Sequence, residues 1–321
     1  MEQPVANIMQ PVANIITSAA LAFAAYGIVA AQPAARPRAW TAPKTDWGAP
    51  DLQGTWNYAT MTPLERPRDL DKAVLSAEEA SAYETRTNDR QRAANNTAGP
   101  DWWDPGTQHL VDRRTSLLVD PPDGRLPPTT PEAQARAARN AQARRQRGEL
   151  DGPEDLALNV RCLLWATAGP PMLPGVYNND VQIVQTPAFV VIYNEMIHDA
   201  RIVPMDGRPH GRVRQWMGDS RGHWEGPTLV IDTIDFTDRT PVRGSDSNLH
   251  LVERFTRSDR DTIKYEFTMD DPGVWTRPWT AAFPMRHTDE PMYEYACHEG
   301  NARSIEGLLR AARVGERDRP R

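Results

Sequence analysis

The sequence predicts a mainly β protein: an antiparallel β-barrel with an N-terminal arm that contains two helices and with a C-terminal helix. Two observations predict this fold class. Short runs rich in β-branched and aromatic residues follow one another closely from about residue 176 to residue 300, and turn-forming residues separate them. The 321-residue chain also has 29 Pro and 20 Gly, which suits a turn-rich β protein better than a helical bundle.

The N-terminus is typical of an export signal, and we expect residues 1–31 to be a signal peptide. The stretch from Ile15 to Ala31 is apolar, and Val29 and Ala31 occupy the small-residue positions before a signal-peptidase cut. The segment before it contains Glu2 and neither Lys nor Arg, so an uncleaved N-terminal anchor is the alternative. The sequence therefore predicts an exported protein, periplasmic or secreted, without stable membrane insertion after export.

Three segments follow the signal peptide. Residues 32–50 are a Pro/Ala-rich linker without periodicity. Residues 51–175 are expected to hold the first strand and a helical, Pro-rich arm. Residues 176–321 are expected to form the barrel body together with the C-terminal helix.

Capping signals and apolar spacing predict the helices. Ser76 and Glu79 form a capping box at the start of a helix that runs to Ala94. Thr130 and Pro131 are suited to the cap and the first position of a second helix. After Asn301, apolar residues recur at helical spacing and predict the terminal helix.

Turn signals and alternation predict the strands of the body. The turns Glu225–Pro227 and Asp259–Asp261 each separate two β-rich runs and predict hairpins. Ile263 and Tyr265 begin a series of alternate residues that share one face of a strand. The run Met292–Cys297 is expected to complete the set of about eight strands.

Composition and motifs exclude several functional classes. The mean hydropathy of −0.63 predicts a soluble protein. The net charge is −6, so no basic excess supports nucleic-acid binding. The Arg-rich stretch Arg136–Arg147 is a local exception, which we interpret as a solvated helix face, with a polyanion site as the alternative. The sequence has no P-loop, no dinucleotide-binding glycine fingerprint, no HExxH, no CxxC and no Gly-x-Ser-x-Gly.

The first candidate for chemistry is the polar segment Asn194–Arg201. Strand alternation places Glu195, Asp199 and Arg201 on one face and His198 on the other, unless a bend intervenes. Histidine is suited to proton transfer near neutral pH, so His198 is a candidate acid–base residue. The alternative is a salt-bridged barrel end in which Arg201 pairs with Asp199 or Glu195.

The second candidate is the run His250–Arg254, in which His250 and Arg254 alternate with Leu251 and Glu253. If the leucine face is the core, Glu253 is buried beside it and requires a partner. If the opposite face lines a cavity, His250 and Arg254 point into that cavity. The sequence leaves both arrangements open.

The third candidate surrounds Cys297. Because adjacent residues on a strand point apart, Cys297 and His298 are poorly placed as a nucleophile and its base. We interpret Cys297 as one half of a disulfide with Cys162, and His298 with Glu299 as an acid–base pair or a strand-end cap. Two free buried thiols are the alternative. No spacing among the candidate histidines is typical of a metal site, so none is predicted.

Aromatic side chains supply candidates for ligand binding. Tyr193, Trp275 and Trp279 are expected to line an aromatic-binding cavity, where Arg201 and Arg254 would contact the same substrate. The alternative is that these aromatic residues are simply part of the core.

Several motifs carry a resemblance to known proteins. The Gly-x-Trp of Gly54–Trp56 resembles the first strand of lipocalin-like, calycin-type barrels, in which the Trp closes one end. Four further motifs together resemble a set that recurs in a large group of exported bacterial proteins, most of them uncharacterised. These motifs are RCL at 161–163, VQIVQTPAFVVIYNEMIHDARIVPMDGRPH at 181–210, WMGDSRGHWEG at 216–226 and YEYACHEGN at 293–301.

The second resemblance implies a cofactor-independent lyase that acts on a small aromatic, lignin-derived compound by decarboxylation, deformylation or dehydration. In this hypothesis His198 or His250 removes a proton, Arg201 or Arg254 stabilises the developing anion, and His298 returns the proton. The partner is a small hydrophobic or aromatic molecule, and no cofactor is required. The alternatives are a lipocalin-like exported carrier without turnover and a structural envelope protein, which would have no deep cavity.

Overall fold

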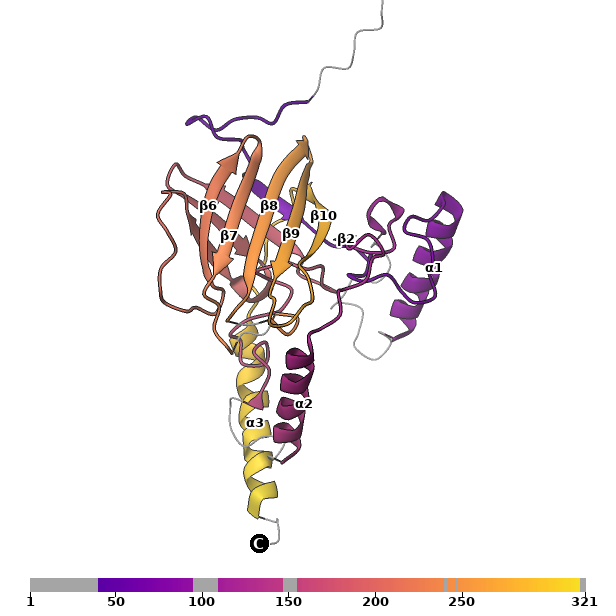
Figure 1. Cartoon of the computed structure of the whole chain (residues 1–321), viewed down its shortest axis with the longest axis vertical. Coiled ribbons are helices and arrows are strands. Elements are labelled where there is room, and N and C mark those ends of the chain that lie inside the picture. Colours follow the sequence, from indigo (N-terminus) through magenta and orange to yellow (C-terminus); the bar gives the residue numbers. More distant parts are fainter. Residues whose placement is uncertain (1–39, 95–108, 147–154, 240–241, 246, 318–321) are drawn as a thin grey trace, which may run out of the picture. The chain divides into compact units, whose positions relative to one another are not determined.

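The computed structural model of the protein describes residues 40–94, 109–146, 155–239, 242–245 and 247–317 (Figure 1). The predicted signal peptide and most of the predicted linker lie outside these residues. Among the helices in the described segments, none combines the length and the apolar character that a membrane crossing requires.

Ten antiparallel strands of the described chain form one sheet, which confirms the mainly β fold. Nine strands follow one another in the order β5-β4-β3-β1-β10-β9-β8-β7-β6, and β2 also pairs with β10. The three-residue strand β2 was not predicted, because it is too short to show a period. The bounds are β1 Gly54–Asn57, β2 Leu118–Asp120, β3 Asp180–Gln185, β4 Phe189–Asn194, β5 Ala200–Pro204, β6 Asp219–Glu225, β7 Thr228–Ile234, β8 His250–Asp259, β9 Thr262–Asp270 and β10 Trp279–Thr288.

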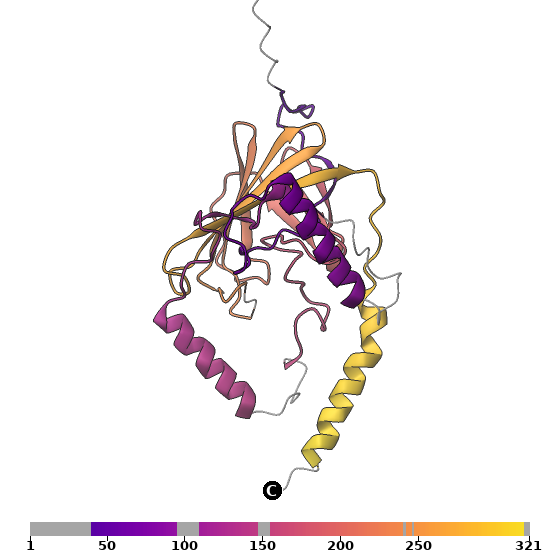
Figure 2. The ribbon, with the colours of Figure 1, turned by 90° about the vertical axis from the view of Figure 1, so that its right-hand side faces the viewer.

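The sheet curls, so that its two end strands come close together (Figures 1 and 2). A Cβ atom at Gly222 of β6 would lie only 3.0 Å from Cγ1 of Val203 in β5. Glycine therefore permits this close approach. In the described ladder β5 and β6 are not paired with each other, so side-chain contacts join the two ends of the sheet.

The inner face of the curled sheet encloses the core. The alternate residues Ile263, Tyr265, Phe267 and Met269 of β9 are all fully buried, which confirms the predicted face. Both predicted hairpins are also present, as β6–β7 and β8–β9. Large side chains fill the interior, among them Trp56, Tyr58, Phe255, Trp279 and Phe283.

Helices α1 (Ala77–Ala94) and α2 (Pro131–Gln146) begin where their caps predict. The Ser76 N–H donates to Oε2 of Glu79 at 2.9 Å, and the Glu79 N–H donates to Oγ of Ser76 at 3.2 Å, so the capping box is complete. Oγ1 of Thr130 accepts a hydrogen bond from the N–H of Ala133 at 3.1 Å. Figure 1 shows α1 beside the sheet, and α2 at one end of it.

Helix α3 (Cys297–Arg317) starts earlier than predicted, and the strand expected over Met292–Cys297 is wrong. Pro291 has no N–H for a strand ladder, and the N–H of Tyr293 donates to Oε1 of Glu195 at 3.1 Å instead. The segment therefore crosses to the helix without joining the sheet.

A bend interrupts the strand run that contains His198. Residues Met196–His198 form a 3₁₀ turn between β4 and β5, and Ile197 and His198 have φ values of 61° and 50°. Simple alternation from Glu195 to Arg201 therefore does not apply, because the turn separates the two strands.

Candidate functional site

A buried polar cluster connects β5, β8 and β9 across the interior. The guanidinium of Arg201 donates to both carboxylate oxygens of Glu253, with Nη2 2.9 Å from Oε1. The hydroxyl of Tyr265 donates to Oε1 of Glu253 at 2.7 Å and accepts the N–H of Met172 at 3.0 Å. Arg201 is 7% exposed, and the other three residues are 0% exposed.

This cluster resolves the alternatives left open for Glu253 and Arg201. The leucine face of β8 is the core, Glu253 is buried beside it, and its partner is Arg201 rather than a substrate. Burial alone would lower the pKa of Arg201, but the charge and hydrogen bonds of Glu253 outweigh burial and raise it. Burial, followed by the charge of Glu253, raises the pKa of Tyr265. Both groups therefore keep fixed protonation states, as a structural pair does.

His250 lies on the outer face of the sheet in a second polar cluster. Its Nε2 is 2.6 Å from Oδ2 of Asp232 on β7, and Nε2 of His210 is 2.8 Å from Oδ1 of the same carboxylate. Nδ1 of His210 is 3.3 Å from Oδ2 of Asp219. Two imidazoles thus share one carboxylate, an arrangement that can pass protons between them. His210 and Asp232 were not predicted, because only the folded loop brings His210 onto the sheet.

Arg254 also lies on the outer face, where Nη2 donates to Oε2 of Glu225 at 2.6 Å. Tyr193 is half-buried on β4 and alternates with the inward-facing residues Ile192 and Asn194. Because neither side chain faces the interior, the predicted cavity between Arg201, Arg254 and Tyr193 does not form.

The remaining acid–base candidates stand apart from these clusters. His198 is exposed on the 3₁₀ turn, and His298 and Glu299 are exposed on the first turn of α3. Among the described residues, no hydrogen bond or ion pair joins His198, His250 and His298. The structure therefore does not bring the predicted catalytic residues together.

Trp275 and Trp279 belong to the core, as the alternative interpretation held. They are 7% and 0% exposed, and their ring centroids lie 6.1 Å apart in an edge-on contact. Trp279 also contacts Phe267, at 5.7 Å between centroids. Edge-on aromatic pairs of this kind stabilise a packed interior.

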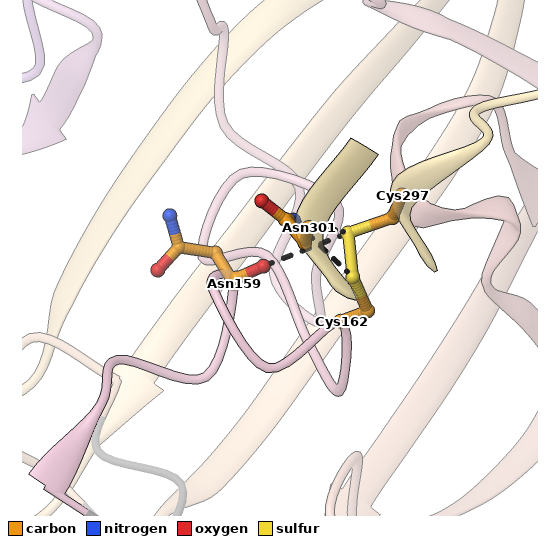
Figure 3. Close-up of a disulfide and its surroundings, with 4 residues drawn as sticks. All are labelled: Asn159, Cys162, Cys297 and Asn301. Atoms are coloured by element: carbon orange, nitrogen blue, oxygen red, sulfur yellow. Dashed lines mark hydrogen bonds between the residues drawn. A yellow bond between two sulfur atoms is a disulfide. The ribbon is translucent and has the colours of Figure 1, made fainter. Parts of the chain in front are cut away.

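The cysteines form a disulfide, Cys162–Cys297, with 5.9 Å between the Cα atoms (Figure 3). The side-chain amide of Asn301 donates to both sulfur atoms, at 3.4 Å and 3.2 Å. The bond ties the loop around Cys162 to the first turn of α3.

That loop forms the wall of a cleft of about 1050 Å³. Leu173 on its lining is also part of the hydrophobic core, so the cleft lies against one end of the packed interior. Two tryptophans, Trp165 and Trp216, lie among aliphatic side chains on the lining. The apolar residues around them are Leu156, Leu158, Leu164, Leu173 and Val242.

The ring of Trp165 is held by two tyrosines. Its centroid lies 6.1 Å from that of Tyr177 and 6.1 Å from that of Tyr295, both edge-on. Burial, together with the smaller effect of the hydrogen bond with Tyr177, raises the pKa of Tyr295 to about 12. The Trp165 ring is therefore oriented before any ligand arrives.

None of the predicted site residues other than the disulfide adjoins this cleft. Its lining contains Arg161 and Trp216, which lie within motifs that carried the sequence resemblance, and Arg144, which lies in the Arg-rich stretch. These were the available sequence signals. No sequence spacing relates the three residues, because the helix, the loop and the segment before β6 that carry them come together only in the folded chain.

Asp199 is a partly buried carboxylate for which the described residues provide no salt bridge, and it provides a test of local electrostatics. Its Oδ2 is buried without a hydrogen-bond partner, and burial raises its pKa from 3.8 to about 6. The carboxyl group of Asp199 therefore keeps its proton to higher pH in the folded protein than in the unfolded chain. The contribution of this group to the free energy of unfolding is fully present below about pH 4 and decreases as the pH rises through 6.

We expect Asp199→Asn to stabilise the protein at pH 7 and to leave its stability at pH 4 almost unchanged. The full pKa shift corresponds to ~3 kcal/mol, and solvent screening of this partly exposed group reduces the expected gain to ~1 kcal/mol. Urea unfolding at both pH values measures the gain. Asp206→Asn is the control, because the hydrogen bond from Arg208 lowers the pKa of Asp206. A stability gain for Asp199→Asn that is equal at pH 4 and pH 7 would contradict the assignment.

Comparison with known protein families, with curated proteins and with solved structures finds no match to this chain.

Proposed function

We propose that this protein is an exported carrier that binds a small aromatic molecule in the cleft beside Trp165 and Trp216. The observation that carries the proposal is the composition of the cleft wall. Aliphatic side chains and two indole rings make up most of it, with four arginines, Asn159 and Thr167 among them, and its described lining residues include no His, Asp, Glu, Cys, Lys or Tyr. Such a wall offers a stacking surface but no group that exchanges protons near neutral pH.

The architecture supports the same proposal. Trp56 is fully buried, its Nε1 donates to the carbonyl of Leu52 at 3.0 Å, and the guanidinium of Arg257 lies 5.2 Å from the centre of its ring. A Trp in this position fits a calycin-like barrel closed at one end. Large side chains fill the interior of the curled sheet. The ligand site is therefore proposed in the cleft beside Trp165 and Trp216 rather than inside the barrel. The disulfide is compatible with export.

A lyase is the second candidate function, and one observation favours it. The carboxylate of Asp232 lies between His210 and His250 on the outer face of the sheet. In this cluster one imidazole can accept a proton from the substrate, and the other imidazole can return a proton to the product. In this alternative the aromatic compound would be cleaved rather than carried.

One experiment separates the two functions. The protein is incubated without added cofactor with aromatic dimers and phenolic acids, bound compounds are detected by native mass spectrometry, and the compounds are analysed again after release. We expect retention and recovery of unchanged compound. Trp165→Ala and Trp216→Ala should each weaken binding about tenfold, the effect of ~1.4 kcal/mol of lost stacking.

Trp47→Ala is the control, because Trp47 is 41% exposed and does not line the cleft. A product that has lost carbon dioxide, formaldehyde or water would replace the carrier with the lyase, provided that His250→Gln abolishes its formation. Equal binding by the wild type and both cleft variants would place the ligand elsewhere.

A further inference from the structure

We propose that the ligand of the cleft is an anion, and specifically an aromatic carboxylate. The tryptophans of the cleft bind its aromatic body, and arginines bind its carboxylate group. This inference rests on the proposed carrier function and names its ligand class. The observation behind it is that four arginines lie among the apolar residues of the lining, where an apolar ligand alone would not require them. They are Arg144, Arg161, Arg239 and Arg243.

The four guanidinium groups come from three separate parts of the chain. Arg144 lies on α2, Arg161 lies beside the disulfide, and Arg239 and Arg243 lie within the connection between β7 and β8. The chain as a whole has a net charge of −6. A local concentration of positive charge on such a protein is not a consequence of its average composition.

The described part of the chain supplies no counter-ion to these four charges. Among the described residues, no carboxylate lines the cleft, and none of the four arginines forms an ion pair. Other arginines of the protein do pair: Arg201 with Glu253, for example, and Arg254 with Glu225. Because a guanidinium stays charged at all physiological pH values, the described lining of the cleft carries positive charge that no described carboxylate neutralises.

Hydrogen bonds hold the turn at Arg243 in place and attach it to α2. Arg243 has a φ of 54°, a value that non-glycine residues seldom adopt, in a tight turn where Val242 and Ser245 exchange backbone hydrogen bonds of 2.7 Å and 2.9 Å. Nη2 of Arg136 on α2 donates to the carbonyl of Gly244 in the same turn at 3.0 Å. The turn that presents Arg243 is thus attached to the helix that carries Arg144.

The chemistry of the two kinds of side chain defines the ligand. A planar guanidinium binds a carboxylate through two parallel hydrogen bonds, and it is more weakly hydrated than an ammonium group, so it suits a partly apolar site. Indole rings and leucines favour an aromatic body. A cleft of about 1050 Å³ has room for a compound of one or two aromatic rings with its acid group.

The test compares three biphenyl probes of the same size: biphenyl-4-carboxylate, the corresponding carboxamide and the corresponding primary alcohol. Isothermal titration calorimetry with the full protein measures each affinity at low and at high salt. We expect the carboxylate to bind at least tenfold more tightly than either neutral probe, and we expect this preference to shrink as salt rises. The double variant Arg161→Gln with Arg243→Gln should remove the preference while it retains the affinity for the neutral probes.

Arg260→Gln is the matched control, because Arg260 is exposed on the β8–β9 turn and does not line the cleft. Circular dichroism and thermal melting establish that each variant is folded. If the three probes bind equally and Trp165→Ala weakens all of them, the anion preference is overturned and the carrier function stands. If no probe binds at either salt concentration, both the ligand class and the carrier function are overturned.

Discussion

Removal of the disulfide is expected to produce the largest loss of stability. The Cys162–Cys297 bond closes a loop with a sequence separation of 135 residues, and in the chain-entropy treatment such a bond restricts the unfolded chain by ~5 kcal/mol. The double variant Cys162→Ser with Cys297→Ser should therefore melt ~10 °C or more below the wild type, since 1 kcal/mol corresponds to roughly 2–4 °C in a chain of this size.

Thermal melting with and without a reductant measures this effect. The wild type should lose stability when it is reduced, and the double variant should not respond to the reductant. Because the bond ties the cleft wall to α3, reduction should also weaken ligand binding. A wild type that melts at the same temperature under reducing and oxidising conditions would contradict a stabilising role for the bond.

Truncation of Glu253 is expected to have the second large effect. Glu253→Ala leaves the guanidinium of Arg201 buried without its counter-ion, and removal of one partner from such a pair costs ~3–5 kcal/mol. It also removes the acceptor for the hydroxyl of Tyr265. Chemical denaturation measures the change in the free energy of unfolding.

The double variant Arg201→Met with Glu253→Leu is the control, because it removes both charges and fills the space with apolar atoms. We expect it to recover most of the lost stability, since buried ion pairs are often replaced by apolar side chains at little cost. Tyr265→Phe should cost ~1–3 kcal/mol, because it leaves the buried N–H of Met172 without an acceptor. A loss below 1 kcal/mol for Glu253→Ala would show that solvent reaches Arg201.

Local sequence signals predicted the elements well wherever a short-range interaction creates them. The capping box of Ser76 and Glu79 and the cap at Thr130 determine the helix starts through contacts within a single turn. The alternation around Tyr265 determines a buried face because side chains on a strand point alternately to its two sides. The failure over Met292–Cys297 also has a specific cause: the N–H of Tyr293 is bonded to the distant side chain of Glu195.

The candidate site was predicted much less well. Sequence distance does not reveal that Arg201 faces Glu253, 52 residues away, because that contact depends on how the sheet curls. The pairing of His210 with Asp232 depends likewise on the path of a loop over the outer face. The predicted histidines therefore remained separate once the chain was folded, and the cleft formed from residues that no single motif joins.

The sequence by itself determined that this is a mainly β protein with capped helices, because propensity, alternation and capping act between near neighbours. Only the tertiary structure decided which polar side chains are internal partners and which line a cleft without an ion pair to any described residue. The physical reason is that burial and long-range pairing are properties of the packed chain. The same residue type forms a buried ion pair at Arg201, whereas Arg161 lines a cleft and has no ion pair within the described segments.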